Sequence, residues 1–176
     1  MFVRFRSASI FIGLVLAFVA ATAGASSAQT FSEYLYLSDG FAVSGPSAPA
    51  LSKQTAQSGV GPVETRIWTW DFTETAVVIA VADYPKINST VQEVLSNAAD
   101  GEAGAWKCGH VTSKTPIVLQ GISGLECVID GTEFHGRSRI FFQGLRLWQI
   151  LSLASTGSPL NAQTDRMFAS FRFVTP

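Results

Sequence analysis

The chain is poor in the residues from which catalytic and metal sites are most often built. Its 176 residues include only two cysteines, Cys108 and Cys127, and two histidines, His110 and His135. Charged residues make up only 14% of the chain, and the formal net charge is −1. Lysine and arginine form no basic cluster beyond two arginines in one apolar run, so the sequence argues against a nucleic-acid-binding surface.

The sequence also lacks the spacing patterns typical of hydrolytic enzymes. Ser123, in Gly-Ile-Ser-Gly, does not fit the G-x-S-x-G nucleophile motif, and it precedes a predicted strand instead of joining a strand to a helix. Glu126 and Asp130 lie four residues apart on that strand, which separates them by about 13 Å. This exceeds the roughly 5–9.5 Å between the carboxyl groups of glycosidases. We therefore expect no enzyme and no cofactor.

The four sulfur- and imidazole-bearing residues allow several interpretations. An even cysteine count in an exported protein favours a disulfide, here between Cys108 and Cys127, which would contribute about 3 kcal/mol. Two separate buried thiols are the alternative. Cys108, His110, Cys127 and His135 would together also suit zinc or copper, although they lack the paired spacing of most metal motifs.

One long hydrophobic run lies at the start of the chain. Two arginines precede an uncharged apolar stretch at residues 10–21, and small residues follow. This order is typical of a secretory signal peptide cleaved after Ala28 or, as a second choice, after Ala25. The apolar stretch is shorter than the roughly 20 residues of a membrane-spanning helix. We expect residues 1–28 to be a signal peptide and 29–176 a single domain, periplasmic or secreted, without a stable membrane span.

Alternating apolar and polar residues predict mostly strands in the mature chain. Strands are expected at 33–38, 41–45, 66–72, 76–85, 115–121, 125–131, 137–142 and 145–153, with a short last one at 171–174. Residues 45–64, rich in Gly, Pro and Ser, are expected to be loop with at most one weak edge strand.

Two helices are expected among these strands. Thr90 and Glu93 have the capping-box spacing, which starts a helix that fades near Gly101. Ser158 and Pro159 fit the N-cap and first position of a second helix. Runs of strands interrupted by two helices indicate an α+β fold with an antiparallel sheet.

The apolar run at 137–154 predicts the central hairpin of this sheet. A turn at Gln143-Gly144 would pair Ile140 with Leu147 on a wholly apolar face directed at a helix. On the other face, Arg139 would lie opposite Trp148, and Phe141 opposite Arg146, with guanidinium groups stacked on rings. We expect this second face to be partly open and to be a candidate partner surface.

Trp68 and Trp70 share one face of a predicted strand, and Trp148 lies on another strong strand. Such aromatic residues line a ligand pocket or, more commonly, pack in the core. They complete the candidate partner or ligand surface with Arg139, Phe141 and Arg146.

Several of these positions together resemble the PsbP-like superfamily. The similar positions are Gly121, Gly124, Glu126, Arg139, Arg146-Leu147-Trp148 and Phe168 to Phe171. The resemblance implies a central antiparallel sheet flanked by helices, an α/β/α sandwich. Its members are mostly non-enzymatic and include a photosystem II subunit, a Ran-binding import factor and small DcrB- and LpqN-type envelope proteins.

The leading hypothesis is therefore an exported, non-catalytic adaptor or binding protein of the cell envelope or periplasm. Its partner would be another envelope protein or a small apolar ligand. The alternative is a periplasmic carrier of a small ligand or metal, built on the three tryptophans or on the Cys/His set.

Overall fold

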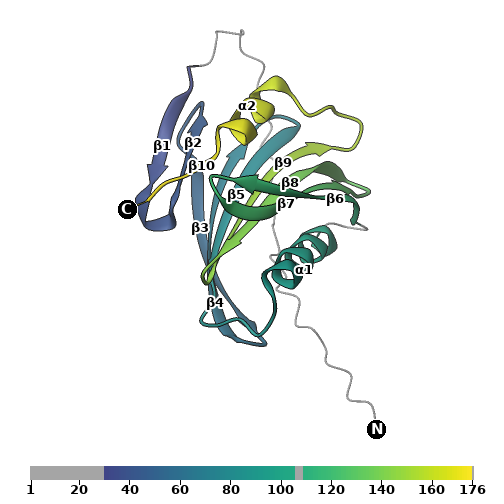
Figure 1. The fold of residues 1–176 in the computed structure, drawn as a ribbon. Coiled ribbons are helices and arrows are strands. Elements are labelled where there is room, and N and C mark those ends of the chain that lie inside the picture. Colours follow the sequence, from purple (N-terminus) through teal and green to yellow (C-terminus); the bar gives the residue numbers. More distant parts are fainter. Residues whose placement is uncertain (1–29, 106–108, 176) are drawn as a thin grey trace.

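The computed structural model describes residues 30–105 and 109–175, which form two antiparallel sheets and two α-helices (Figure 1). The smaller sheet has the order β1-β2-β10 and the larger one the order β3-β4-β5-β9-β8-β7-β6. The strands are β1 Ser32–Tyr36, β2 Phe41–Gly45, β3 Ala50–Ser58, β4 Gly61–Asp71, β5 Thr75–Asp83, β6 His110–Leu119, β7 Ile122–Asp130, β8 Phe134–Gln143, β9 Arg146–Ser155 and β10 Arg172–Phe173. The helices are α1 Val91–Gly104 and α2 Ala162–Ser170, and a 3-10 turn, η1 Leu37–Asp39, joins β1 to β2.

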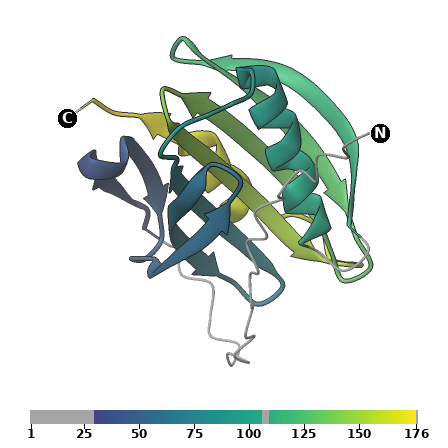
Figure 2. The same cartoon turned by 90° about the horizontal axis from the view of Figure 1, so that it is seen from below.

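Different elements pack on the two faces of the large sheet. Helix α1 contacts β6, β7 and β8, whereas α2 contacts β2, β5 and β9. The three-stranded sheet lies on the same side as α2 and completes that layer (Figures 1 and 2). The expected α+β class with antiparallel sheets is confirmed. The expected covering by helices alone needs correction, because a small sheet shares one of the two outer layers.

Each face of the large sheet has its own apolar core. The larger core is rich in aromatic rings and is closed by α2 and the small sheet; it includes Phe41, Trp68, Trp70, Phe141, Trp148, Met167, Phe168 and Phe171. The other core lies beneath α1 and is built mainly from aliphatic side chains, among them Leu95, Leu125, Ile129, Ile140 and Leu147. Within the described ranges, no helix is both long and apolar enough to cross a membrane.

The structure confirms the expected order of strands and helices, with two local corrections. Residues 50–58 form a full edge strand, β3, of nine residues rather than mostly loop. Thr90 caps α1 and forms the reciprocal capping box with Glu93, as the spacing predicts. Helix α2, however, begins after Asn161, whose side chain accepts a hydrogen bond from the Thr164 amide at 2.9 Å. The prediction of Ser158 as the N-cap is therefore wrong.

The hairpin of β8 and β9 is present, but its turn lies one residue later than predicted, which shifts each pairing by two residues. Gln143 pairs with Arg146, and Phe141 pairs with Trp148. The turn is Gly144-Leu145, with Gly144 at a φ of 63°. A glycine with positive φ at the first central position fits a type II′ turn, whereas the prediction placed glycine second. The apolar face still contains Ile140 and Leu147, and as predicted it packs beneath a helix, α1.

Candidate functional site

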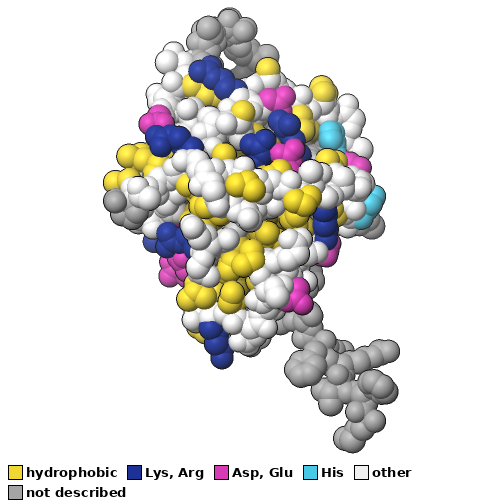
Figure 3. All heavy atoms as spheres, viewed as in Figure 1, with side chains coloured by type: hydrophobic (Ala, Val, Ile, Leu, Met, Phe, Trp, Pro, Cys, Tyr) yellow, Lys and Arg dark blue, Asp and Glu magenta, His cyan; other side chains and the backbone are white. Residues whose placement is uncertain are grey.

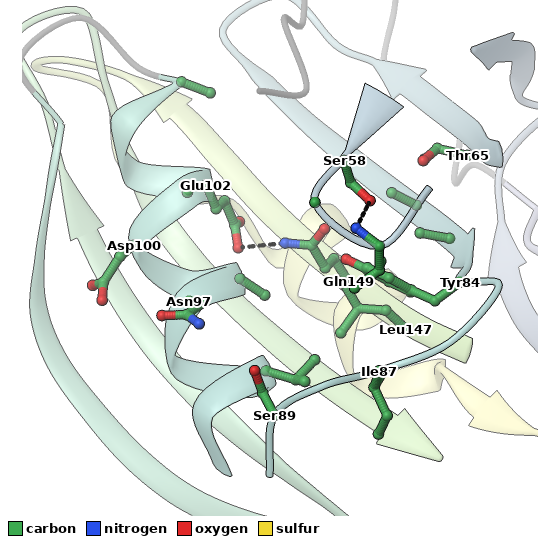
Figure 4. A pocket seen from close by; sticks show the side chains of 18 of the residues that line it. Ser58, Thr65, Tyr84, Ile87, Ser89, Asn97, Asp100, Glu102, Leu147 and Gln149 are labelled. Atoms are coloured by element: carbon green, nitrogen blue, oxygen red, sulfur yellow. Dashed lines mark hydrogen bonds between the residues drawn. The ribbon is translucent and has the colours of Figure 1, made fainter. Parts of the chain in front are cut away.

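A cleft of about 330 Å³ lies between α1 and the half of the large sheet that α1 leaves uncovered. Its floor is formed by β4, β5 and β9, and one wall by α1. The β3–β4 turn and the loop after β5 close its remaining sides, as Figure 4 shows with Ser58 and Ile87. Ligand pockets in proteins commonly have volumes of about 300–1,000 Å³, so this cleft lies at the lower end of that range.

The cleft exists because β5 carries small side chains on one face only. Val77, Ile79 and Val81 point into the aromatic core, whereas the alternate positions on the cleft side are Ala76, Val78, Ala80 and Ala82. Successive residues of a strand point to opposite faces, so this alternation separates bulky from small side chains. The facing part of α1 is also small, with Ala98 and Gly101 in the lining. Small residues on both surfaces leave room between them.

Glu102 is a buried carboxyl group in the wall of this otherwise mostly apolar cleft. It lies on α1 and is 9% exposed. Its Oε2 accepts hydrogen bonds from Ser138 Oγ at 2.9 Å and from Gln149 Nε2 at 3.3 Å. Figure 4 shows its side chain extending from the helix towards Gln149 on the sheet. The other oxygen, Oε1, is buried and has no hydrogen-bond partner.

Burial raises the pKa of Glu102 to about 8, against the weaker opposing effect of its two hydrogen bonds. Removal from water disfavours the charged form of a carboxyl group, and no buried cation lines the cleft among the described residues. Lys86, which lines the rim, is exposed. At neutral pH the group is therefore mainly a neutral acid, with one oxygen committed to two donors and the other unpartnered.

The polar groups nearest the mouth come from the loop after β5 and from α1. Tyr84 lies in the lining and points towards the cleft in Figure 4. Burial raises the pKa of its phenol, so its hydroxyl group stays neutral at physiological pH. Asn97 and Asp100 on α1 are exposed at the edge. The cleft thus combines an apolar floor, a buried acid and a polar rim.

The tryptophans expected to line a ligand or partner surface lie on the opposite face of the sheet from the cleft. Trp68, Trp70 and Trp148 belong to the aromatic core and are at most 6% exposed. Trp70 and Trp148 donate hydrogen bonds to the carbonyl groups of Ser47 and Asp39, at 2.7 and 2.8 Å. Trp68 and Trp70 share one face as expected, Trp148 lies on the same side of the sheet, and the structure supports the core-packing alternative for all three.

The expectation that the Arg/aromatic face of the hairpin is partly open is wrong for its aromatic members. Phe141 is fully buried against Phe171 and Phe173. Arg139 does not stack on Trp148 but lies 4.4 Å from the centre of the Phe168 ring and pairs with Glu126 at 2.7 Å. The small sheet and α2 cover this face, which sequence periodicity alone does not reveal. Arg139 and Arg146 remain partly exposed.

Arg146 belongs to an ion-pair network at one end of the sheet. Asp83 accepts from Arg146 Nε at 2.5 Å and from Arg66 at 2.6 Å. Arg66 also pairs with Asp39 of η1, and Arg146 donates to the Ser38 carbonyl at 2.8 Å. The sequence predicted that Arg146 stacks on Phe141. Instead, Arg146 links the large sheet to the β1–β2 connection.

The structure does not bring the Cys/His set together. Cys127 is a fully buried free thiol on the α1 side of β7, next to Ser138 in register. His110 and His135 both lie opposite Asp130, three positions from Cys127, and so point to the other face of the sheet. Cys108 lies outside the described residues. No metal-binding group of three or more His, Cys, Asp or Glu occurs within residues 30–105 and 109–175.

Sequence reasoning missed Glu102 and the cleft, although two signals were present. One is the alternation of small and bulky residues along β5. The other is an acidic residue on α1 whose neighbours are mostly alanine and glycine. These small residues offer its carboxyl group no partner on the same helix. Neither signal indicates a cleft until the structure shows which strands of the sheet α1 covers.

The surface shown in Figure 3 gives no competing charged site. Basic and acidic side chains are interspersed on this face, and hydrophobic side chains gather in its lower half. No broad field of one charge sign occupies this view.

Comparison with known proteins gives a match at the level of structure. No family model and no curated protein sequence matches the chain. The solution structure of cyanobacterial PsbP (CyanoP) from Synechocystis sp. PCC 6803 does match, with a TM-score of 0.56. The match covers 87% of this chain and 98% of that chain, at 13% sequence identity. The chain has a PsbP-like fold.

The resemblance noted in the sequence is thus confirmed for the fold. Because the identity is only 13%, the PsbP-like fold carries over the arrangement of elements and no residue roles. The cleft beneath α1 therefore has to be interpreted from its own chemistry.

Proposed function

We propose that this protein is an exported, non-catalytic binding protein that holds a small apolar molecule in the cleft beneath α1. The observation that carries the proposal is the cleft itself, about 330 Å³ in volume and floored by aliphatic side chains of β4, β5 and β9. An apolar concave site with a few polar groups is the usual form of a small-ligand site. The PsbP-like fold supports a binding or accessory role, because its known members are mostly non-enzymatic.

Export is the second part of the proposal, and it rests on the signal-peptide pattern of residues 1–28. The protein recovered from outside the cytoplasm should begin at Gln29 or, with the alternative cleavage site, at Ser26. N-terminal sequencing of that material tests this directly. Protein that retains Met1 in the exported fraction would contradict cleavage.

The binding site is tested by filling it. Ala98 lies on α1 in the cleft lining and is half-buried, so Ala98→Leu places three additional carbon atoms in the cleft with little strain on the helix. Gln92→Leu is the matched control, because Gln92 is exposed on the same helix and does not line the cleft. The probe is 2-methylheptane, a hydrocarbon that an apolar cleft of this size should admit.

Binding is followed by titrating the probe and recording amide chemical shifts of β5 and α1. The wild-type protein and Gln92→Leu should show saturable shifts around the cleft, and Ala98→Leu should bind at least tenfold more weakly. Equal binding by all three proteins, or no saturable shift in the wild type, would refute the proposal. In parallel, organic extracts of protein purified from its native location should contain a small apolar molecule detectable by mass spectrometry.

A further inference from the structure

We propose that the cleft selects a neutral ligand whose hydrogen-bond acceptor, such as a ketone or ester carbonyl, accepts a hydrogen bond from the carboxylic acid of Glu102. This inference rests on the proposed binding function and specifies the class of molecule that it serves. It starts from one unpaired atom, Glu102 Oε1, which is buried next to the apolar cleft that the Glu102 side chain lines.

The hydrogen bonds of Glu102 determine where its proton lies. Oε2 already accepts from Ser138 on β8 and from Gln149 on β9. The proton of the neutral acid is therefore placed on Oε1, which becomes a donor without an acceptor. A buried polar group left without a partner costs about 1–3 kcal/mol. A ligand carbonyl would recover that cost once the carboxyl group turns this hydrogen towards the cleft, which favours an acceptor on the ligand.

The surroundings of Glu102 argue for a neutral ligand. A carboxylate ligand would have to be buried without a cation, because the lysine of the described lining, Lys86, is exposed on the rim. A cationic amine would require Glu102 to be ionised, which burial in the cleft opposes. The floor offers Ile67, Val78 and Leu151 to the remainder of the molecule. A ligand with a neutral hydrogen-bond acceptor at one end and an apolar remainder is therefore compatible with Glu102 and with the floor.

The volume limits the size of this molecule. A cavity of about 150 Å³ admits a benzene ring, and the cleft is roughly twice as large. The ligand that occupies it is therefore a short chain or a single substituted ring. A longer molecule would have to extend past the rim near Asn97.

Three probes of one skeleton separate these chemistries: 2-heptanone carries an acceptor, 2-methylheptane a methyl group and 2-aminoheptane a cation at the same carbon. Each is titrated into the full protein and into Glu102→Leu and Glu102→Gln. In Glu102→Leu, the affinity for the ketone relative to the hydrocarbon should fall about tenfold. In Glu102→Gln, which keeps a donor, it should fall less than threefold. An unchanged ratio in Glu102→Leu, or tightest binding of the amine by the wild type at pH 6.5, would overturn the inference.

A pH titration of the wild-type protein provides a test that needs no variant. Ionisation of Glu102 removes the donor, so 2-heptanone should bind at least fivefold more weakly at pH 9.5 than at pH 6.5, and 2-methylheptane should change much less. The other titratable groups around Glu102 and the cleft are Cys127 on β7, Tyr84 in the lining, and the rim charges of Asp100, Lys86 and Lys114. Burial raises the pKa of both Cys127 and Tyr84, and the pKa of Cys127 rises to about 11.

The outcomes distinguish this inference from the proposed function. If no probe binds the wild-type protein, the cleft is not a ligand site and the proposed function fails. If 2-methylheptane binds and the ketone shows neither dependence on Glu102 nor dependence on pH, the binding function stands and the acceptor class is wrong.

Discussion

The side-chain amide of Gln149 on β9 donates to the Glu102 carboxyl group on α1 across 3.3 Å, and this contact joins the helix to the floor of the cleft. It also places an ionisable group where water is excluded. Burial, against the opposing effect of this hydrogen bond, favours the neutral acid, so the stability of the fold depends on the protonation of Glu102.

Glu102→Gln should change the pH dependence of folding in a defined direction. The folded-state pKa of about 8 lies above the ordinary value of 4.5, so between these values the folded protein binds more protons than the unfolded chain. The free energy of unfolding contributed by this group must then fall as pH rises through that window. Glutamine does not titrate, so the free energy of unfolding of the variant does not fall for this reason. Relative to the wild type, Glu102→Gln should gain several kcal/mol between pH 5 and pH 9, measured by urea unfolding. Parallel stability profiles would show that Glu102 is not buried as described.

The thiol of Cys127 should be unreactive in the folded protein and free once it is unfolded. Burial, together with the nearby carboxyl group of Glu102, raises its pKa to about 11, so little reactive thiolate forms at neutral pH. Without any reductant, iodoacetamide should label Cys127 rapidly in 6 M urea and hardly at all in buffer, as read by peptide mass spectrometry. A Cys127 that resists labelling in urea until a reductant is added would instead support the disulfide with Cys108.

The ion-pair network at Asp83 should lose its contribution in acid. Burial acts to raise the pKa of Asp83, but the hydrogen bonds from Arg146 and Arg66 outweigh it and lower the pKa below 3.8. Its stabilisation is therefore complete above the unfolded-state pKa and is lost as pH falls through the folded-state value. Because the side chain is 38% exposed, solvent screening limits the effect, and Asp83→Asn should cost about 1 kcal/mol at pH 7. The difference from the wild type should shrink as the pH is lowered through the folded-state pKa of Asp83. A loss of equal size at pH 7 and in acid would assign the effect to packing.

The order of elements could be predicted from the sequence because it depends on local chemistry. The capping box at Thr90 and the alternation in the second half of β7 act within a few residues. The hairpin register could not be fixed in this way, since Gly144 fits either central position of a two-residue turn and each choice gives a different pairing. Only the full set of neighbouring strands decides between them.

The candidate site depended on information that is not local. The sequence pattern placed Trp68 and Trp70 on one face correctly, but whether that face is open depends on β1, β2 and β10, and β10 lies far from the other two along the chain. Likewise, Ala80 and Ala82 mark a cleft only because α1 covers β6 to β8 and stops short of β4 and β5. Tertiary packing, rather than periodicity, separates the core from the binding surface.

The packing of the hairpin leads to a prediction that separates core from surface at the β8–β9 unit. Trp148 fills the aromatic core, 5.1 Å from the Phe173 ring, and its indole N–H donates to Asp39. Trp148→Ala should therefore cost about 3–5 kcal/mol of unfolding free energy in urea. Leu145→Ala, in the exposed turn of the same hairpin, is the control and should change stability by less than about 0.5 kcal/mol.

Arg139→Ser should lie between these two variants. It removes the pair with Glu126 and the contact with the Phe168 ring, each worth about 0.5–1 kcal/mol at a partly exposed site. A partner that docks on the hairpin would then have to use Arg139 or Arg146, because the rings beside them are covered. If Trp148→Ala destabilises the protein as little as Leu145→Ala does, the small sheet does not close this face in solution. Trp68, Trp70 and Trp148 would then again be candidates for a binding surface.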